Sequence, residues 1–421
     1  MMISLNTRFI LLFSLLSIAA TTRAQFGSDL QFFRPPSKAG LNQFEPPKTD
    51  TTTFTKIKVR VGGDFALQFQ GLSQTNAGDT LVDLGSDLNL PTANLNLNVQ
   101  LADGVRMHLR TYLSSRHHSE AWVKGGHLRI DKLNFIRKGF LEGLMRYTTL
   151  TVGLDEVNYG DAHFRRTDNA SAIYNPFVGN YIMDSFTTEA FADVNVQVKG
   201  FLMVLGVSNG KLNQSVVVND QTDNALSFFG KLGYDGQVSE DLRVRLTGSW
   251  YINHGSSTGT WLYGGDRAGG RYYSVYHSLV QGGSDFEPRV NARFTKITAI
   301  QVNPFVKFKG LEFFGIYELA AGAETGDGSY TQLAGELLFR FGKQEQFYLG
   351  GRYNTVSGKS KEVDALKDIA RYNVGGGWFM TPNILAKVEY VAEERTGPGW
   401  EGTKFAGAAF NGIMVEAAIS F

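Results

Sequence analysis

The charged side chains with the clearest chemical potential are concentrated in one segment, residues 155–186, which reads DEVNYGDAHFRRTDNASAIYNPFVGNYIMDSF. Its candidate functional residues are Asp161, His163, Arg165, Arg166 and Asp168. Acids and bases that face each other across a narrow aqueous passage create a transverse field, which sorts solutes by charge. We therefore expect these five side chains to line a constriction; the alternative is a solvated external loop with scattered charge.

Motifs for enzymatic or metal chemistry are missing from this sequence. The seven His form no HExxH pair, there is no GxSxG elbow, and a chain without Cys has no thiol nucleophile or Cys-ligated metal. His108 and His127 are interpreted as polar wall residues. The glycine-rich run 264–270 lacks the Lys-Ser/Thr of a phosphate-binding loop. We predict no enzyme activity, no catalytic or metal site and no cofactor.

The elements that must position the charged residues show a strict alternation of polar and apolar side chains, which is the period of a β-strand. In residues 94–101 Asn and Gln alternate with Leu and Val, and the pattern recurs along the chain from residue 56. The segments run about 9–13 residues, which matches a tilted transmembrane strand of ~9–11 residues. Charges repeat on the polar parity, and a packed soluble core would tolerate them only as pairs. We therefore expect the apolar parity to face lipid and the polar parity to face a wet lumen.

Counting these segments together with their turns predicts sixteen strands. They lie near 56–74, 91–101, 104–114, 121–135, 147–154, 187–198, 201–208, 224–235, 241–253, 300–308, 311–324, 329–341, 345–356, 368–380, 384–395 and 405–421. Their joints alternate between tight turns, such as 199–200, and long loops, such as 254–299. The apolar stretch from Tyr272 to Val280 would make the total odd, so we place it inside the 254–299 loop as a local hairpin arm. The prediction is an all-β fold, a single closed antiparallel transmembrane barrel with an inward-folded constriction loop at 155–186 and a long extracellular loop at 254–299.

The same alternation assigns a set of bases to the lumen wall. These candidates are Arg60, Arg106, Arg110, Arg243 and Arg245. On the inward parity as a whole bases outnumber acids, although the formal net charge of the chain is only +1. A basic wall would raise the occupancy of anions in the lumen. We expect a preference for anions such as phosphate; the alternative is that these bases pair with facing acids and loop residues.

The composition agrees with a barrel and excludes other classes. The 421 residues include 48 Gly, 31 Phe and 17 Tyr, and charged residues make up 19%, below the usual share of about 25%. Many glycines and aromatics suit tightly pleated walls with aromatic belts, and few charges suit a lipid-facing outer surface. The near-zero net charge provides no electrostatic footprint for nucleic acid.

The N-terminus predicts export. Arg8 precedes an apolar run from Phe9 to Ala20, and Thr22 and Ala24 supply the small residues of a cleavage site, so residues 1–24 fit a secretory signal peptide. The apolar run is shorter than the ~20 residues of a membrane-spanning helix, and a retained anchor is the alternative.

Between this leader and the first strand, residues 25–55 contain two Pro-Pro pairs and a run of three Thr. This composition predicts an irregular periplasmic tail. A plug is the alternative, although so short a segment cannot fill a sixteen-strand lumen. The barrel then comprises residues 56–421.

The end of the chain carries a family resemblance. Apolar residues alternate from Ile413 and the sequence stops on Phe421, which resembles the C-terminal signature strand of bacterial outer-membrane proteins. Together with the loop NYGDAHFRRTDN after the fifth strand, the chain resembles a bacterial outer-membrane porin. The stretches LQFFRPPSKAGLNQFEPPK and KVRVGGDFALQFQ are similar to porin-like barrels of Bacteroidota, and the whole chain more loosely resembles the phosphate-selective porin O/P superfamily.

The resemblance implies a multi-pass barrel in the bacterial outer membrane that lets small hydrophilic solutes or ions diffuse passively. It also implies contact with outer-membrane lipid, a homotrimer, recognition of the Phe421 strand by the barrel-assembly machinery, and an inward fold of the loop after the fifth strand. One alternative is a channel for hydrophobic solutes of the long-chain fatty-acid transporter type, with residues 25–55 as its hatch. A less favoured alternative is an outer-membrane barrel enzyme.

Overall fold

The computed structural model describes most of the chain beyond the expected leader. The described residues are 30–50, 52–113, 121–212, 216–218, 225–255, 261–264, 271–290, 292, 294, 296–322, 328–360 and 363–421. The signal peptide expected at 1–24 lies outside them. Within these ranges no helix combines the length and the apolar character needed to cross a membrane.

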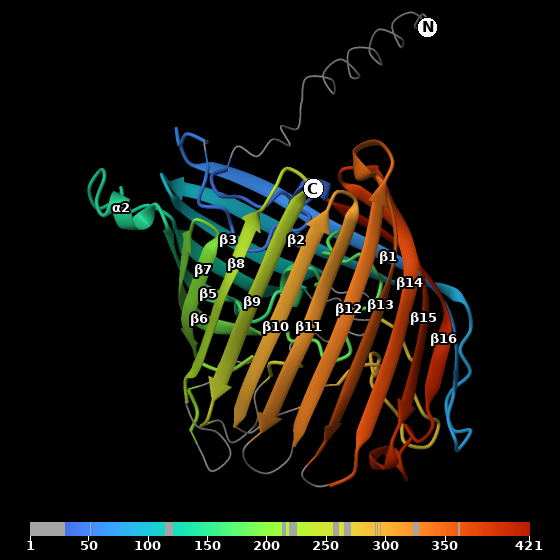
Figure 1. The fold of residues 1–421 in the computed structure, drawn as a ribbon. Helices are drawn as coiled ribbons and strands as arrows, with labels where there is room; N and C mark the ends of the chain where they lie inside the picture. Colours follow the sequence, from blue (N-terminus) through green and yellow to red (C-terminus); the bar gives the residue numbers. More distant parts are fainter. Residues whose placement is uncertain are drawn as a thin grey trace, which may run out of the picture.

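The described strands form one closed antiparallel barrel of sixteen strands (Figure 1). The first eight are β1 (Lys58–Thr75), β2 (Asp87–Ala102), β3 (Val105–Leu113), β4 (Ala121–Ile130), β5 (Thr148–Glu156), β6 (Thr188–Val198), β7 (Phe201–Ser208) and β8 (Ser227–Gln237). The second eight are β9 (Leu242–Asn253), β10 (Ile297–Phe308), β11 (Leu311–Gly322), β12 (Ser329–Phe341), β13 (Phe347–Lys359), β14 (Lys367–Thr381), β15 (Ile384–Thr396) and β16 (Ala409–Ser420). The barrel closes where β1 pairs with β16, with Asp64 opposite Ser420.

The described helices are single turns in the connections. They are η1 (Lys38–Gly40), α2 (Glu142–Met145), η2 (Ala162–Phe164), η3 (Lys343–Glu345) and η4 (Pro398–Trp400). The strands therefore build the whole wall, and the helices only shape the segments that join them.

The predicted sixteen strands are confirmed, and most boundaries agree within about three residues. The apolar stretch from Tyr272 to Val280 adds no strand to the barrel; it forms turns and two isolated bridges, in which Ser278 pairs with Leu81 and with Gly282. The prediction extended the fourth strand to residue 135, but β4 ends at Ile130. The reason is the connection 131–147, which leaves the barrel wall and contains α2.

Period-two patterning sorts the side chains of each strand onto two faces. In β15 the outward Val388 and Tyr390 are exposed, whereas the inward Lys387, Glu389 and Glu393 are buried. The inward polar residues are buried because other segments of the chain occupy part of the lumen. The barrel therefore has an exposed apolar outer surface and a polar interior.

Short turns join the strands at the rim that carries the C-terminus (Figure 1). The two-residue turn between β6 and β7 has positive φ at both Lys199 (50°) and Gly200 (88°), as expected for a hairpin turn whose twist matches the flanking strands. At this rim the connection 131–147 is much longer than its neighbours, and α2 projects sideways from the wall (Figure 1). Longer connections lie at the opposite rim.

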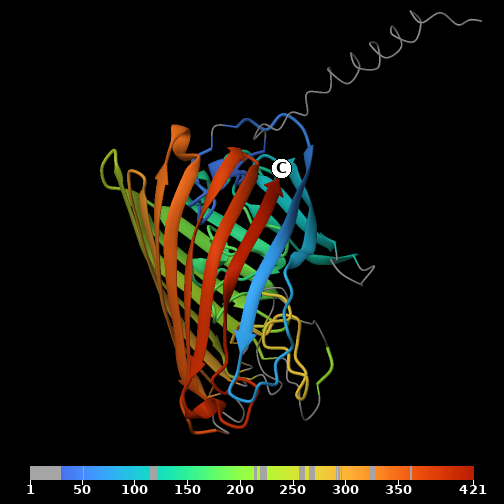
Figure 2. The ribbon, with the colours of Figure 1, turned by 90° about the vertical axis from the view of Figure 1, so that its right-hand side faces the viewer.

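The described segments that fold into the barrel include the N-terminal strap (residues 30–50), the inward loop (157–187) and the second inward loop (271–290). The strap lies near the rim that carries the C-terminus, and the inward loop (green) crosses the interior (Figure 2). Tyr159, Phe177 and Ile182 of the inward loop and Tyr272 of the second inward loop are almost completely buried. The inward fold predicted for the loop after the fifth strand is confirmed.

Two other segments lie elsewhere than the sequence suggested. The strap, expected to be part of a tail outside the barrel, packs inside it, since Asn42 contacts Glu312 of β11 and Lys48 contacts Asp131 beside β4. The described part of 254–299, expected to be an external loop, reaches the inner wall, where the Tyr272 hydroxyl donates to Glu389 at 2.7 Å. In both cases an inward strand carboxylate provides the partner that a segment in solvent would lack.

Candidate functional site

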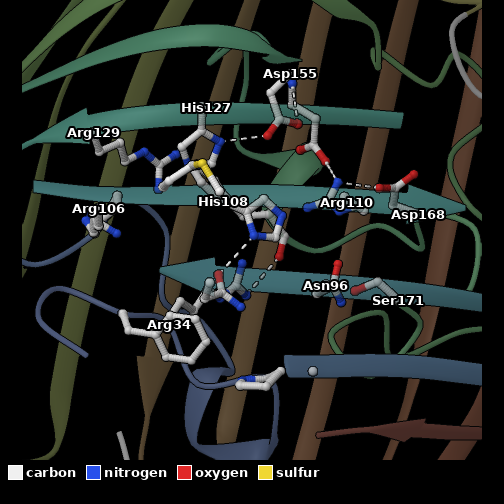
Figure 3. A pocket seen from close by; sticks show the side chains of 18 of the residues that line it. Arg34, Asn96, Arg106, His108, Arg110, His127, Arg129, Asp155, Asp168 and Ser171 are labelled. Carbon is white, nitrogen blue, oxygen red and sulfur yellow. Dashed lines mark hydrogen bonds and ion pairs between the residues drawn. The ribbon is translucent and has the colours of Figure 1, made fainter. Parts of the chain in front are cut away.

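The site is a cavity of about 240 Å³ enclosed by the N-terminal strap, the inward loop and the inner faces of β1 to β6 (Figure 3). Its polar wall consists of Asn96, Asn98, Arg106, His108, Arg110, His127, Arg129 and Asp155. The strap contributes Arg34 and Phe33, and the inward loop contributes His163, Arg166 and Asp168. The cavity is therefore bordered by charged side chains from three parts of the structure: the barrel wall, the strap and the inward loop.

Asp161 of the inward loop lies in a buried cluster outside this cavity. Its carboxylate contacts Lys231 Nζ of β8 at 2.8 Å and Arg245 Nε of β9 at 2.8 Å, and Glu45 of the strap also contacts Arg245 at 2.8 Å. Burial alone would raise the pKa of Asp161, but Arg245 and Lys231 hold it well below its ordinary value. The cluster joins the strap and the inward loop to the wall, and it does not face open space.

Arg165 and Arg166 are also ion-paired and almost fully buried. Arg165 Nη2 lies 2.7 Å from Glu312 and 2.6 Å from Glu336, and the guanidinium of Arg166 binds Asp184 in a bidentate arrangement with Nε at 2.8 Å. Bidentate charge-assisted bonds fix geometry strongly. Arg165 lies away from the cavity, whereas Arg166 reaches its edge.

The remaining loop candidates meet at the cavity. Asp168 accepts from Arg110 Nη1 at 2.7 Å, and the same nitrogen contacts Glu156 at 3.0 Å. His163 contacts Glu156 at 3.3 Å. Burial lowers the pKa of His163, and the hydrogen bond to Glu156 opposes that shift only in part. Arg110, Asp168 and His163 thus form one network on the cavity wall.

The structure separates the five wall bases into two groups. Arg106 and Arg110 line the cavity. Arg243 and Arg245 lie beyond it and contact Asp235 at 2.8 Å and 3.1 Å. Arg60 lies outside the lining and stacks over the ring of Phe33 at 4.5 Å. The predicted bases therefore point into the lumen, but most already have a carboxylate partner.

Four basic cavity residues were not among the candidate constriction and wall bases: Arg34, His108, His127 and Arg129. The two histidines were expected only as polar wall residues. His108, His127 and Arg129 lie on inward parities, so strand alternation carried a signal for their direction. Arg34 lies in the irregular strap, where no periodicity could indicate it. Its guanidinium stacks on Tyr174 at 3.7 Å and donates to the carbonyls of Gly40 and Phe164, both at 3.0 Å.

Metal chemistry finds no support in the resolved part of the site. No group of three or more His, Asp or Glu among the described residues has an arrangement that could hold a metal ion. The histidines instead bind single neighbours: His127 Nδ1 contacts Asp155 at 2.7 Å and His108 Nδ1 contacts Asn98 at 2.9 Å.

Comparison with solved structures places the chain among barrels of the porin fold. The anion-selective porin from Comamonas acidovorans aligns with a TM-score of 0.51 and 11% identity, over 87% of this chain and 100% of that one. Salmonella typhi OmpF gives a TM-score of 0.51 and 11% identity, over 86% and 97%. OmpT, an outer membrane protein of Vibrio cholerae, aligns with a TM-score of 0.51 and 11% identity, over 88% of this chain and 99% of that one. Comparison with protein-family models and with curated proteins gives no match. This structural similarity establishes a porin-type sixteen-stranded barrel, and it concerns the fold alone.

Proposed function

We propose that the protein is an outer-membrane porin through which small hydrophilic solutes diffuse passively. The observation that carries this proposal is the polar cavity, which remains between the strap, the inward loop and the wall of a barrel of porin fold. Sixteen strands enclose a lumen wide enough for an aqueous channel, and inward segments narrow it to a space lined by charges. Liposome swelling with neutral sugars tests this function, and vesicles that stay impermeable to all of them would contradict it.

The outer surface supports a location in the bacterial outer membrane. Outward Val388, Tyr390 and Leu349 are exposed and apolar, as the lipid-facing band of a barrel requires. Phe421 pairs with Gly63 of β1 through two backbone hydrogen bonds of 3.1 and 3.0 Å, so the chain end completes the seam. We infer that the barrel-assembly machinery recognises this last strand. The Vibrio cholerae OmpT structure includes a trimer form, and we propose a homotrimer here, which crosslinking in native membranes would test.

The charges of the cavity support a preference for anions. Arg34 and Arg129 have no carboxylate within ion-pair distance among the described residues, whereas Glu156 and Asp168 both contact Arg110. The one lining acid without a basic partner, Asp64, is held by Asn96 and Ser420. Five arginines line the cavity against four carboxylates, and this excess of positive charge in the lining raises the local anion concentration. Reversal potentials across a KCl gradient should therefore lie nearer the chloride value, and a potential nearer the potassium value would contradict the preference.

The position of the strap inside the lumen gives the hydrophobic-solute channel its strongest argument, because such channels need a hatch. Phe32 and Phe44 of the strap are indeed buried. However, the cavity wall that a solute would pass carries Arg106, Arg110 and Arg129, and an alkyl chain gains nothing from charged side chains. Uptake of a long-chain fatty acid by vesicles that exclude sugars would favour this second function.

A further inference from the structure

Four basic residues form a two-by-two block on the cavity wall. In the pairing of β3 with β4, Arg106 lies opposite Arg129, and His108 lies opposite His127. Positions two apart on one strand share a face, so all four side chains of this basic block point into the lumen. The two imidazole rings have centroids 5.3 Å apart, and all four residues line the cavity (Figure 3).

The two arginines of the basic block repel each other. Like charges directly opposite each other on neighbouring strands destabilise a sheet, and Arg106 and Arg129 are such a pair. Arg129 has no ion pair or hydrogen bond within the described ranges. Arg106 uses Nε to contact Asp131 at 3.0 Å, while its Nη2 is buried without a hydrogen-bond partner.

The acids around the basic block are already engaged with other groups. Asp131 also contacts Lys48 at 3.2 Å and the Thr149 hydroxyl at 2.6 Å, and Asp155 binds His127. Asp193 is two strands away from Arg129, with Thr151 between them in the register. Buried donors without acceptors cost free energy, so a ligand that supplies acceptor oxygens would be stabilised here.

The part of the lining that comes from the strap and the inward loop differs in character. Arg34 of the strap also faces the cavity without a carboxylate partner among the residues described. Beside it lie the aromatic rings of Phe33, Phe44 and Phe164. A volume of about 240 Å³ corresponds to roughly eight waters at ~30 Å³ each, which exceeds the needs of a bare inorganic ion. The cavity therefore offers charge to one end of a ligand and apolar contact to the other.

We propose that the basic block is a binding station for the oxyanion group of a small organic anion, a carboxylate or a phosphate ester, in transit through the channel. The oxyanion accepts hydrogen bonds from Arg106 and Arg129, and the carbon skeleton lies against the aromatic side of the strap. This inference rests on the proposed porin function, because it names the class of solute that the cavity retains. The head group alone could also come from inorganic phosphate, so the experiment separates the two sources.

The test uses the full-length protein in planar bilayers, with benzoate, acetate, inorganic phosphate and phenyltrimethylammonium as probes. We expect benzoate to block the chloride current saturably and at lower concentration than acetate or phosphate, and the cation of similar size to leave the current unchanged. Arg129→Gln and Arg106→Gln should each raise the half-blocking concentration of benzoate about tenfold or more, as expected for loss of a charge-assisted hydrogen bond. Lys307→Gln, which removes a wall base paired with Glu345 at 2.8 Å, is the matched control and should leave the block unchanged.

Titration calorimetry of benzoate in detergent measures the same binding without requiring conductance. A protein that conducts chloride but binds benzoate equally well with and without Arg129 overturns the station and leaves the porin function standing. Phosphate that binds as tightly as benzoate overturns the organic class of ligand. A protein that binds benzoate in detergent yet never conducts contradicts the porin function alone. Heat-modifiable electrophoretic mobility shows that each variant is folded, and Arg106→Gln keeps the test decisive if Arg129→Gln does not fold.

Discussion

Lys231 of β8 and Asp161 of the inward loop form an ion pair with 2.8 Å between Nζ and Oδ1, and neither side chain is exposed to solvent. Lys231 also donates to the Gly160 carbonyl at 2.7 Å, and the Asp161 backbone N–H donates to Asn303 of β10. Taking two charges out of water is costly unless every partner is present. The pair therefore fixes the start of the inward loop to two parts of the wall at once.

Asp161→Asn should loosen the inward loop more than any exposed substitution does. The change leaves Lys231 buried with Glu45 as its nearest remaining acid, at 3.2 Å, and breaking a buried pair costs about 3–5 kcal/mol. We expect faster proteolysis within the loop and a noisier single-channel current. Lys359→Gln removes an exposed pair with Asp364 and should change neither readout; equal effects of the two substitutions would show that the pair does not anchor the loop.

The wall of this protein follows from its sequence because side-chain direction in a strand depends only on parity. Lys387, Glu389 and Glu393 alternate with outward Val388 and Tyr390, and the structure buries the first set and exposes the second. The turn at 199–200 could also be predicted from the sequence, since Gly200 adopts a positive φ without strain. Local rules of this kind require no knowledge of the rest of the chain.

The contents of the lumen could not be read in the same way. Arg106 and Arg129 face each other only because of the register of β3 and β4, and that register shifts between Arg110 and Thr111. The cluster of Asp161 with Lys231 and Glu45 joins residues far apart in the chain, and no periodicity links them. Sequence reasoning therefore predicted charged residues in the lumen and missed which of them remain unpaired.

Arg110→Gln should shift ion selectivity toward cations. Arg110 is the base that contacts both Glu156 and Asp168, so its removal takes away one positive charge beside these two carboxylates of the cavity. A more negative cavity raises the occupancy of cations. Reversal potentials in a KCl gradient should move toward the potassium value, with Lys307→Gln as the control on the opposite wall. An unchanged potential would show that the conducting path avoids this cavity.

Acid should release the N-terminal strap. Burial alone would raise the pKa of Glu45, but Arg245 and Lys231 lower it below its ordinary value in the folded protein. A carboxyl group whose pKa is lowered by folding contributes stability that is present above its unfolded pKa, near 4.3, and is lost as the pH falls through the folded value. Proteolytic cleavage of the strap by an acid-active protease should therefore accelerate below about pH 4. In Glu45→Gln the cleavage should be fast at neutral pH as well, and a wild-type strap that stays protected down to pH 2 would contradict the role of this carboxylate.

Deletion of residues 30–48 should raise the single-channel conductance. The strap is held at several points of the wall, since the Lys38 backbone N–H donates to the Pro382 carbonyl at 2.7 Å, Asn42 contacts Glu312, and Lys48 contacts Asp131. Its removal opens one whole side of the cavity while the sixteen strands keep their own hydrogen bonds. Heat-modifiable mobility should show that the barrel still folds. Asn42→Ala is the comparison, because it removes one anchor and keeps the strap. A conductance that rises for the deletion and stays near wild type for Asn42→Ala would show that the strap itself narrows the channel. An unchanged conductance after the deletion would place the limiting constriction in the inward loop.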